Sequence, residues 1–430
     1  MARKNTMIKT IQEKVGNIKY DASKFSDEIL IEIKDKFSDF TDSRYQPNVK
    51  HIYGEVIGMA LIALLAGNDT WIDIEEFCEL SKEYFKKYFL LPAGIPSHDT
   101  FERCFKILDN DELLASMVNV VTSIVDKFYL KAEGKSFVDD NKSITDIIAV
   151  DGKAMLGSYK ASSKYGEVKK LQLLNVYSTE YGLCLSSTPI DEKTNEIPVS
   201  QSVLSTMKLN NKIVTCDALN TQKEFSKIIV NQKGDYVLAL KENQHDIYED
   251  VKLYFSDENF INEIKSKAGR HLEQIEKNHS KIEKRYYYVL DDVNWYYRLN
   301  EWTGIKSFVK EEKIIENLIT GEISKEERYF ISTLTDVNLI SIAIRRHWNI
   351  ENNLHWQLDY TFGDDSNTTS DKESARALSI MKRFALSLIQ IVKGFYGNNV
   401  SIRRIRKRMS YGFKYIEEFF SYLSASNHII

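Results

Sequence analysis

Two aspartates directly follow short apolar runs, where a carboxylate could do metal-dependent chemistry. Asp151 follows IIAV and Asp217 follows IVTC. A carboxylate at the end of a buried strand is held rigidly and still reaches solvent. A single aspartate of this kind is more often the first residue of a turn. If the two strands are parallel neighbours, however, both side chains emerge at one rim of a sheet.

A third carboxylate belongs to a stripe of polar residues spaced four apart, which places them on one face of an α-helix. The stripe consists of His347, Glu351, His355 and Asp359. One interpretation is a polar face that only contacts neighbouring helices. A zinc site is a weaker interpretation, because the spacing is not that of H-E-x-x-H. The third interpretation joins Glu351 to the two aspartates as ligands of two Mg²⁺ or Mn²⁺ ions, which can hold an attacking and a leaving oxygen in line across a phosphorus.

The elements around the aspartates predict a mixed α/β sheet. Five runs are typical of strands: DIIAVDG, QLLNVYST, GLCLSSTPI, KIVTCDA and DYVLALK. The first three are spaced as in an antiparallel meander. The last two flank a helical pattern, TQKEFSKIIVNQKG, and should therefore be parallel. Residues 245 to about 330 indicate an insertion with a charged helical part followed by extra strands, and helix resumes at about 336 and again at 371–393.

The N-terminal region has the periodicity of helices. They are expected at 26–40, 53–66, 71–90, 99–108 and 111–130. Thr70 with Asp73, and Asp99 with Glu102, have the spacing of helix N-caps. His98, in the break between two of these helices, is interpreted as a capping or loop histidine.

Composition sets the broad class of the protein. The chain has 430 residues, 43% of them hydrophobic and 28% charged, which is ordinary for a globular protein of two or three domains. The four cysteines form no C-x-x-C pair, so a reducing compartment fits. No signal peptide is evident, and VIGMALIALLAGN is shorter than the ~20 residues of a membrane helix. We therefore expect a cytoplasmic protein without membrane contact.

Charge alone does not indicate a nucleic-acid binder. The net charge is −4, yet the C-terminal run SIRRIRKRMS contains five basic residues and no acid. Such a run is either a solvated helix face or a segment that contacts phosphates. Trp302, Trp348 and Trp356 are expected to be core or interface residues rather than platforms for base stacking.

Several long motifs, in order along almost the whole chain, resemble those of the DDE transposases of bacterial insertion sequences, in the ISAs-type group that includes the H-repeat-associated proteins. The motifs are LIALLAGNDTWIDIEEF, LPAGIPSHDTFERCF, AVDGKAMLGS, DEKTNEIP, TCDALNTQ, GDYVLALKENQ, RYFISTL, HWNIENNLHWQLDYTFGDD and ALSIMKRFALSLI. Matches of this length and order are far more specific than an aspartate pair.

The resemblance implies an RNase H-like mixed-sheet catalytic core with a β-rich insertion, preceded by an all-α N-terminal domain. It implies segments at 1–140 (DNA-end recognition), 141–244 (core), 245–332 (insertion), 333–395 (core with the Glu helix) and 396–430 (basic segment). The triad falls on Asp151, Asp217 and Glu351, with two Mg²⁺ or Mn²⁺ ions as cofactors.

The implied partners are the terminal repeats of a transposon and target DNA, bound by a homodimer that associates with the nucleoid. Relatives carry an Arg four residues before the Glu and a Lys seven after it, where this chain has His347 and Leu358. The residues proposed as phosphate contacts instead are Lys241, Arg346, His347, Asn352, His355, Arg403, Arg404, Arg406, Lys407 and Arg408.

Three other functions stay open from the sequence. The chain could be a metal-dependent nuclease without strand transfer, or an inactive transposase descendant that only binds DNA. A carboxylate-pair glycosidase is the least favoured, because it needs two acids ~5–10 Å apart in an aromatic cleft and the aromatic residues here cluster in the insertion.

Overall fold

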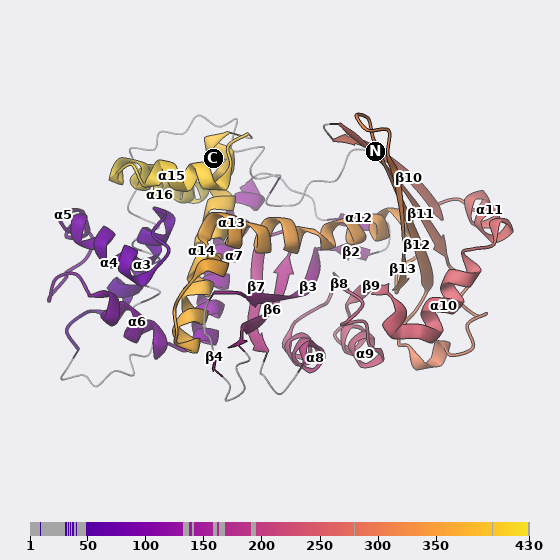
Figure 1. The fold of residues 1–430 in the computed structure, drawn as a ribbon, viewed down its shortest axis with the longest axis horizontal. Coiled ribbons are helices and arrows are strands. Elements are labelled where there is room, and N and C mark those ends of the chain that lie inside the picture. The colour runs from indigo at the N-terminus through magenta and orange to yellow at the C-terminus, as the bar shows by residue number, and fades with distance from the viewer. Residues whose placement is uncertain are drawn as a thin grey trace. The chain divides into compact units, whose positions relative to one another are not determined.

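The computed structural model describes residues 49–131, 137–139, 142–157, 161–162, 168–190, 195–278, 280–397 and 399–428, together with 9, 31, 33, 35, 37 and 40. The helix expected at 26–40 lies mostly outside this set. The chain forms two compact units (Figure 1). Unit 1 comprises Met1–Lys135, Lys153–Pro189 and Glu351–Ile430, and unit 2 comprises Ser136–Gly152 and Ile190–Ile350.

Unit 2 contains the parallel strands that carry both aspartates. Strand β3 (Asp146–Met155), which continues into unit 1 after Gly152, pairs in parallel with β8 (Lys212–Cys216), and β8 pairs in parallel with β9 (Asp235–Leu240). Helices α8 (Glu196–Thr206) and α9 (Lys223–Asn231) precede β8 and β9. Each strand has a run of buried apolar residues, as expected for parallel strands. The predicted parallel pairing is confirmed.

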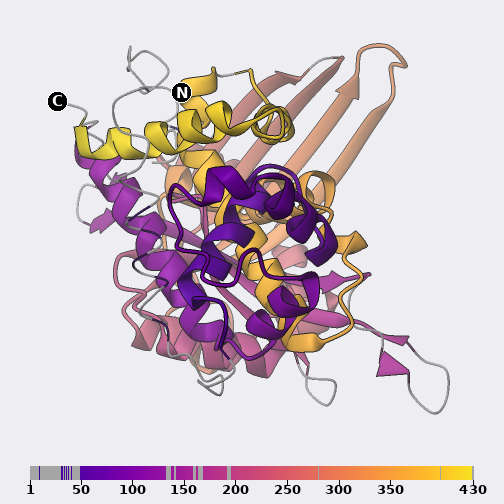
Figure 2. The same cartoon turned by 90° about the vertical axis from the view of Figure 1, so that its left-hand side faces the viewer.

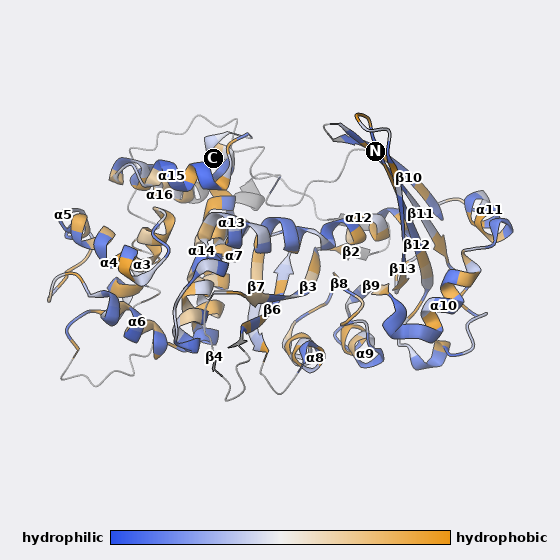
Figure 3. Ribbon diagram, in the orientation of Figure 1, coloured by the Kyte–Doolittle hydropathy of each residue, from blue (hydrophilic) through white to orange (hydrophobic). Residues whose placement is uncertain are grey.

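The insertion extends this sheet beyond β9. Helices α10 (His245–Tyr254) and α11 (Glu258–Ser266) come first, and β10 (His271–Asn278), β11 (Lys281–Leu290), β12 (Ser307–Asn317) and β13 (Ile323–Ser332) follow as an antiparallel series, with β13 next to β9. Figure 3 shows these strands with many hydrophilic residues. In β13 only the last four residues are buried, and these are the residues that pair with β9. Only this end of the strand therefore contributes to the hydrophobic core.

In unit 1, β6 (Leu171–Ser178) follows the last residues of β3 in strand order, and β7 (Leu183–Ile190) follows β6. A connection as short as 179–182 joins antiparallel strands. The order β7, β6, β3, with β3 continuing to β8 and β9, is that of an RNase H-like mixed sheet. The short pairs β1 (Phe137–Asp139) with β2 (Lys142–Ile144), and β4 (Ala161–Ser162) with β5 (Val168–Lys169), are separate.

The helices of unit 1 surround α14 (Lys372–Tyr396), most of whose residues are buried. It packs against α3 (Tyr53–Leu65), α6 (His98–Lys106), α7 (Asn110–Lys131), α15 (Ile402–Met409) and α16 (Phe413–His428), and Figure 2 shows the N-terminal helices gathered around it. The N-terminal region is thus all-α over the described residues 49–131, as predicted, and it includes α4 (Trp71–Leu80) and α5 (Lys82–Phe85). The segment boundaries predicted from the sequence remain a prediction.

Two details of the helical region correct the sequence interpretation. The helix expected at 71–90 is divided after Leu80. The N-cap of α6 is Ser97, whose backbone is extended and whose side chain accepts from the Thr100 amide, so Asp99 already lies inside the helix. Thr70 caps α4 as predicted. Within the described part of the chain, no helix combines the length and apolarity needed to cross a membrane.

Candidate active site

The two aspartates lie at the same level on neighbouring strands of unit 2. Val150 of β3 pairs with Cys216 of β8, so Asp151 and Asp217 are the next residues on two parallel strands. Both side chains are half-buried. Asp151 accepts a hydrogen bond from the Gly152 amide at 2.9 Å, and Asp217 accepts one from the Asn220 amide at 3.3 Å. Each carboxylate is therefore oriented by backbone at the rim of the sheet.

A fourth acid, Glu196, lies beside this pair. A Cβ on Gly152 would come within 2.3 Å of Glu196 Oε2, which explains why the residue after Asp151 has no side chain. The buried Asn220 donates its amide NH₂ to both Glu196 and Asp217. Burial raises the pKa of Glu196, the Asn220 hydrogen bond lowers it, and the charge of Asp217 raises it further. Glu196 belongs to the motif DEKTNEIP, but the motif does not predict this position, because the proximity of Glu196 to Asp217 arises from tertiary structure.

The loop after Asp217 is braced by the KENQ sequence that follows β9. Asn243 and Gln244 both donate side-chain hydrogen bonds to the Ala218 carbonyl, at 2.7 and 2.6 Å, and Gln244 also donates to Thr221 O at 2.8 Å. These contacts fix the peptide that carries Asp217, so the polar residues of the motif have a positioning function.

Asp217 also lines a cavity of about 860 Å³ within unit 2. Its other polar and aromatic lining residues include Lys241, Arg328, His347 and Trp348. His347 ends α12 (Val337–His347), and its Nδ1 lies 3.2 Å from Thr215 Oγ1. Lys241 is exposed. Two of the predicted phosphate contacts, Lys241 and His347, thus share one cavity with Asp217, an acid of the predicted triad.

Three predicted phosphate contacts are buried, and the structure does not support that role for them. They are Arg346, His355 and Arg406, with exposed fractions of 6, 5 and 4%. Asn352 is exposed. A buried side chain is not accessible to a DNA phosphate that approaches from solvent. The local sequence does not show which of these side chains are buried.

Glu351 lies in unit 1, in a π-helical turn, η5 (Ile350–His355), between α12 and α13 (Trp356–Phe362). The side chain is exposed. The predicted stripe assumed 3.6 residues per turn, which the wider π turn does not keep, yet Glu351 and His355, four residues apart, still lie next to each other. Single π-helical turns inside helices occur frequently at functional sites.

His355 is the last residue of this turn, and a buried side chain forms a hydrogen bond with its ring. The amide NH₂ of the buried Asn175 donates to His355 Nε2 at 3.1 Å, so the imidazole carries its proton on Nδ1, which lies 3.7 Å from Glu351 Oε2. Burial lowers the pKa of His355, against the opposing effect of Glu351. Arg383 in turn donates to Asn175 Oδ1 at 3.2 Å. A chain of buried polar side chains therefore ends beside Glu351.

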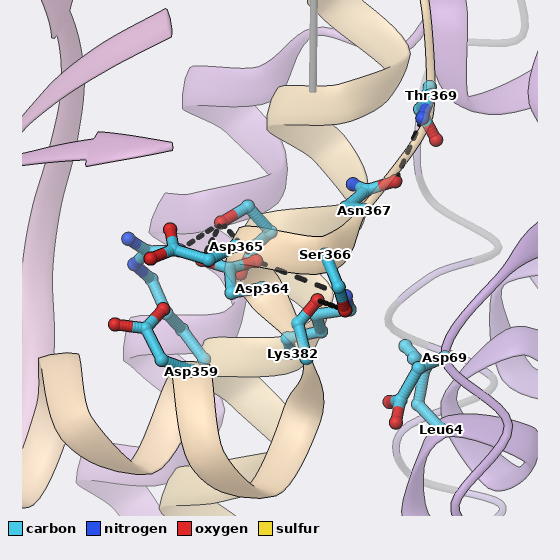
Figure 4. Close-up of polar contacts among 12 residues, drawn as sticks. Leu64, Asp69, Asp359, Asp364, Asp365, Ser366, Asn367, Thr369 and Lys382 are labelled. Atoms are coloured by element: carbon cyan, nitrogen blue, oxygen red, sulfur yellow. Dashed lines mark hydrogen bonds and ion pairs between the residues drawn. The ribbon is translucent and has the colours of Figure 1, made fainter. Parts of the chain in front are cut away.

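Helix α13 is tied to the end of β3 by an ion pair within unit 1. Lys153 Nζ lies 2.6 Å from both carboxylate oxygens of Asp359 and 3.5 Å from Asp365. Asp365 belongs to η6 (Asp364–Ser366), whose Asp364 is buried near Lys382 (Figure 4). This ion pair gives a structural role to Lys153 of the AVDGKAMLGS motif and to Asp359, which follows Glu351 in the chain.

The C-terminal basic run forms the amphipathic helix α15. Ile402, Ile405 and Met409 are buried together with Arg406. Arg406 donates to Leu64 O at 3.1 Å and to Asp69 at 2.7 Å, and its guanidinium covers the Phe362 ring. The remaining basic residues, Arg403, Arg404, Lys407 and Arg408, are exposed. Four of the five predicted basic contacts are therefore exposed, and of these Arg408 pairs with Glu418 at 3.0 Å.

The tryptophans divide into two groups. Trp302 is buried, as predicted. Trp348 and Trp356 are 44% and 52% exposed, so they are not core residues.

The oxygen atoms at the rim of unit 2 fit a hard divalent cation. Asp151 and Asp217 offer carboxylates, the ligands that Mg²⁺ and Mn²⁺ prefer. In the described part of the chain, Asn220 Oδ1 is a buried oxygen without a hydrogen-bond partner, and it belongs to the side chain that bridges Glu196 and Asp217. The donor set thus agrees with the ion type predicted from the sequence.

Comparisons with known proteins match two family models and several related proteins. The family described as "Transposase DDE domain" matches residues 142–388, and the associated domain "DDE_Tnp_1-associated" matches 34–119. YncI of Escherichia coli O157:H7, a transposase by name, is 29% identical over 89% of this chain and 93% of its own. A protein encoded in the dhlA 3′ region of Xanthobacter autotrophicus is 32% identical over 68% of this chain and 90% of its own.

Two further comparisons concern the group and the fold. The H repeat-associated protein YhhI of E. coli K12 is 27% identical over 85% of this chain and 92% of its own. A piggyBac transposase synaptic complex with hairpin DNA aligns with 96% of this chain and 82% of its own, at 12% identity and a TM-score of 0.41. The sequence matches, together with the strand order that carries Asp151 and Asp217, assign the chain to the DDE transposase family, in the group of the H-repeat-associated proteins.

Proposed function

We propose that this protein is a DNA transposase that cuts the phosphodiester bond at transposon ends and transfers the freed strand into target DNA. The observation that carries the proposal is the placement of Asp151 and Asp217 immediately after the paired residues Val150 and Cys216 on two parallel strands. Glu351 is the third acid, and this assignment rests on the family motif. DNA is the partner, and pairing of two ends favours a homodimer.

The three carboxylates would hold two Mg²⁺ or Mn²⁺ ions. The ions supply Lewis-acid charge for the phosphate and a template for in-line displacement. In the first step a water oxygen forms a bond to phosphorus while the bond to the 3′-oxygen breaks, which releases a 3′-hydroxyl and a 5′-phosphate. In the second step that 3′-hydroxyl attacks a target phosphodiester, and the target's own 3′-oxygen leaves.

The protein's other groups bind and orient the DNA. Lys241 and His347 line the cavity that contains Asp217 and would contact phosphate next to the cleaved bond. Asn220 and the Gly152 amide keep the two aspartates in one orientation before substrate binds. Such preorganisation reduces the cost of arranging the reacting groups.

The test is cleavage of a supercoiled plasmid that carries the DNA flanking this gene, with Mg²⁺ or Mn²⁺. We expect nicking at the element ends and joined products with the wild type, and at least about a 100-fold lower rate with Asp217→Ala. Glu249→Ala, which removes an exposed acid on α10, should cut like the wild type.

Three outcomes would contradict the proposal or part of it. Unchanged metal-dependent cleavage by Asp217→Ala would show that Asp217 is not part of the active site. Loss of cutting with a zinc-selective chelator rather than on Mg²⁺ removal would exclude this ion chemistry. Nicking without joined products would reduce the function to that of a nuclease.

A further inference from the structure

Two exposed aromatic rings stack on each other on the helix that follows Glu351. Trp356 and Tyr360, one α-helical turn apart in α13, have ring centroids 4.7 Å apart and planes inclined by only 14°. Trp356 is 52% exposed and Tyr360 54% exposed. Burying these rings would be favourable, so leaving both in water calls for another explanation.

An arginine from α15 completes the stack. The Arg403 guanidinium lies 5.1 Å from the Tyr360 ring centroid and donates to the Tyr360 hydroxyl at 2.8 Å. Arg404 and Lys407 are exposed on the same helix, and among the described residues neither forms an ion pair. Asp359, on the aromatic helix, has its charge compensated by Lys153. The surface thus combines flat aromatic rings with positive charge.

This combination matches the chemistry of an unpaired nucleotide. Bases inside a duplex are stacked on each other and present only their edges, whereas an unpaired base offers a face that can stack on an aromatic ring. Nearby arginine and lysine side chains neutralise the phosphates of the same strand. All five residues belong to unit 1.

We propose that Trp356, Tyr360 and Arg403 form a stacking site for an unpaired DNA base, with Arg404 and Lys407 contacting the phosphates of that strand. The inference rests on the proposed function, because it requires that the protein act on DNA. It adds a preference for single-stranded or frayed DNA, which the metal site alone does not explain.

The test measures binding of a fluorescein-labelled oligothymidine and of a blunt duplex to the full chain in EDTA, by fluorescence anisotropy. Trp356→Ala should weaken oligothymidine binding about tenfold or more, the effect of losing one base–aromatic stack, and should change duplex binding less than about twofold. Trp356→Phe should retain most of the affinity. The matched control is Tyr297→Ala, which removes another exposed tyrosine with an arginine, Arg298, over its ring at 5.4 Å. It should bind both DNAs like the wild type.

Several results would overturn the inference. They are equal losses on the two DNAs, an equal loss in Tyr297→Ala, and wild-type protein that binds the duplex but not the oligothymidine. The last result leaves the proposed function intact, whereas binding to neither DNA contradicts both. If Trp356→Ala instead keeps its DNA affinity but shifts the protein's elution volume in gel filtration, the rings form a contact between protein copies.

Discussion

At the scale of single residues, side-chain amides contact the acids Glu196 and Asp217 and the histidine beside Glu351. Asn220 donates to Glu196 and Asp217 from one nitrogen, and Asn175 donates to His355 behind Glu351. A neutral amide can fix a carboxylate or an imidazole without cancelling its charge. Such an amide can therefore orient a carboxylate that also binds a divalent cation.

His355 gives the clearest prediction at this scale. Because it connects Asn175 to Glu351, His355→Ala should slow metal-dependent cleavage by about 10- to 100-fold, the usual cost of losing a group that orients a ligand. His355→Gln, whose amide can accept from Asn175 and donate toward Glu351, should recover part of the rate. Single-turnover cleavage at saturating Mg²⁺ measures both.

A binding experiment separates this role from the phosphate contact predicted from the sequence. DNA affinity measured at several salt concentrations should have the same slope in His355→Ala and the wild type. A slope reduced by about one, with an unchanged cleavage rate, would restore His355 as a phosphate contact.

At the scale of elements, α15 presents two kinds of arginine on one short helix. Arg406 is enclosed by Leu64, Asp69 and Phe362, and Arg404 faces solvent. We expect Arg406→Ala to lower the free energy of unfolding by about 3–5 kcal/mol, because it leaves the half-buried Asp69 without its cation and the buried Leu64 carbonyl without its donor. Arg404→Ala should change it by less than about 0.5 kcal/mol and reduce the salt slope of DNA binding by about one. Urea titration measures the free energy of unfolding, and DNA binding at increasing KCl measures the salt slope. If Arg404→Ala lowered the stability and Arg406→Ala changed the salt slope, Arg404 rather than Arg406 would face the protein interior.

The same elements show what sequence can and cannot predict. The strands that carry Asp151 and lead to Asp217 were predictable, because a mostly apolar run precedes each acid and a helical pattern lies between KIVTCDA and the next strand. The π turn at Ile350–His355 was not, since its residues have the same local pattern as an α-helix. Nor was the burial of Arg406 predictable, because its partners Leu64 and Asp69 lie far away along the chain and nothing in IRRIRKRM marks which cation turns inward.

At the scale of the whole molecule, the cysteines can report on the two units separately. Cys78, Cys104 and Cys184 are buried in unit 1 and Cys216 in unit 2. Burial raises the pKa of the Cys78, Cys184 and Cys216 thiols, which suppresses the reactive thiolate.

We therefore expect almost no labelling of the native protein by iodoacetamide. In a urea titration with pulsed labelling and mass spectrometry, Cys78, Cys104 and Cys184 should become reactive together, because they share one cooperative unit. Different midpoints for Cys78 and Cys184 would show that unit 1 does not unfold as a whole.

The chain passes between the two units four times, after Lys135, Gly152, Pro189 and Ile350, so neither unit is a continuous stretch of sequence. This arrangement determines the order in which the two units are completed during synthesis on the ribosome. All residues of unit 2 have been synthesised once residue 350 has been added, whereas α14, against which α3, α6 and α7 pack, is made only afterwards. Until α14 has been synthesised, the N-terminal helices of the nascent chain therefore expose the apolar surface that packs against it. A gene truncated after codon 350 would still encode all of unit 2 and would leave those helices without the helix that they surround.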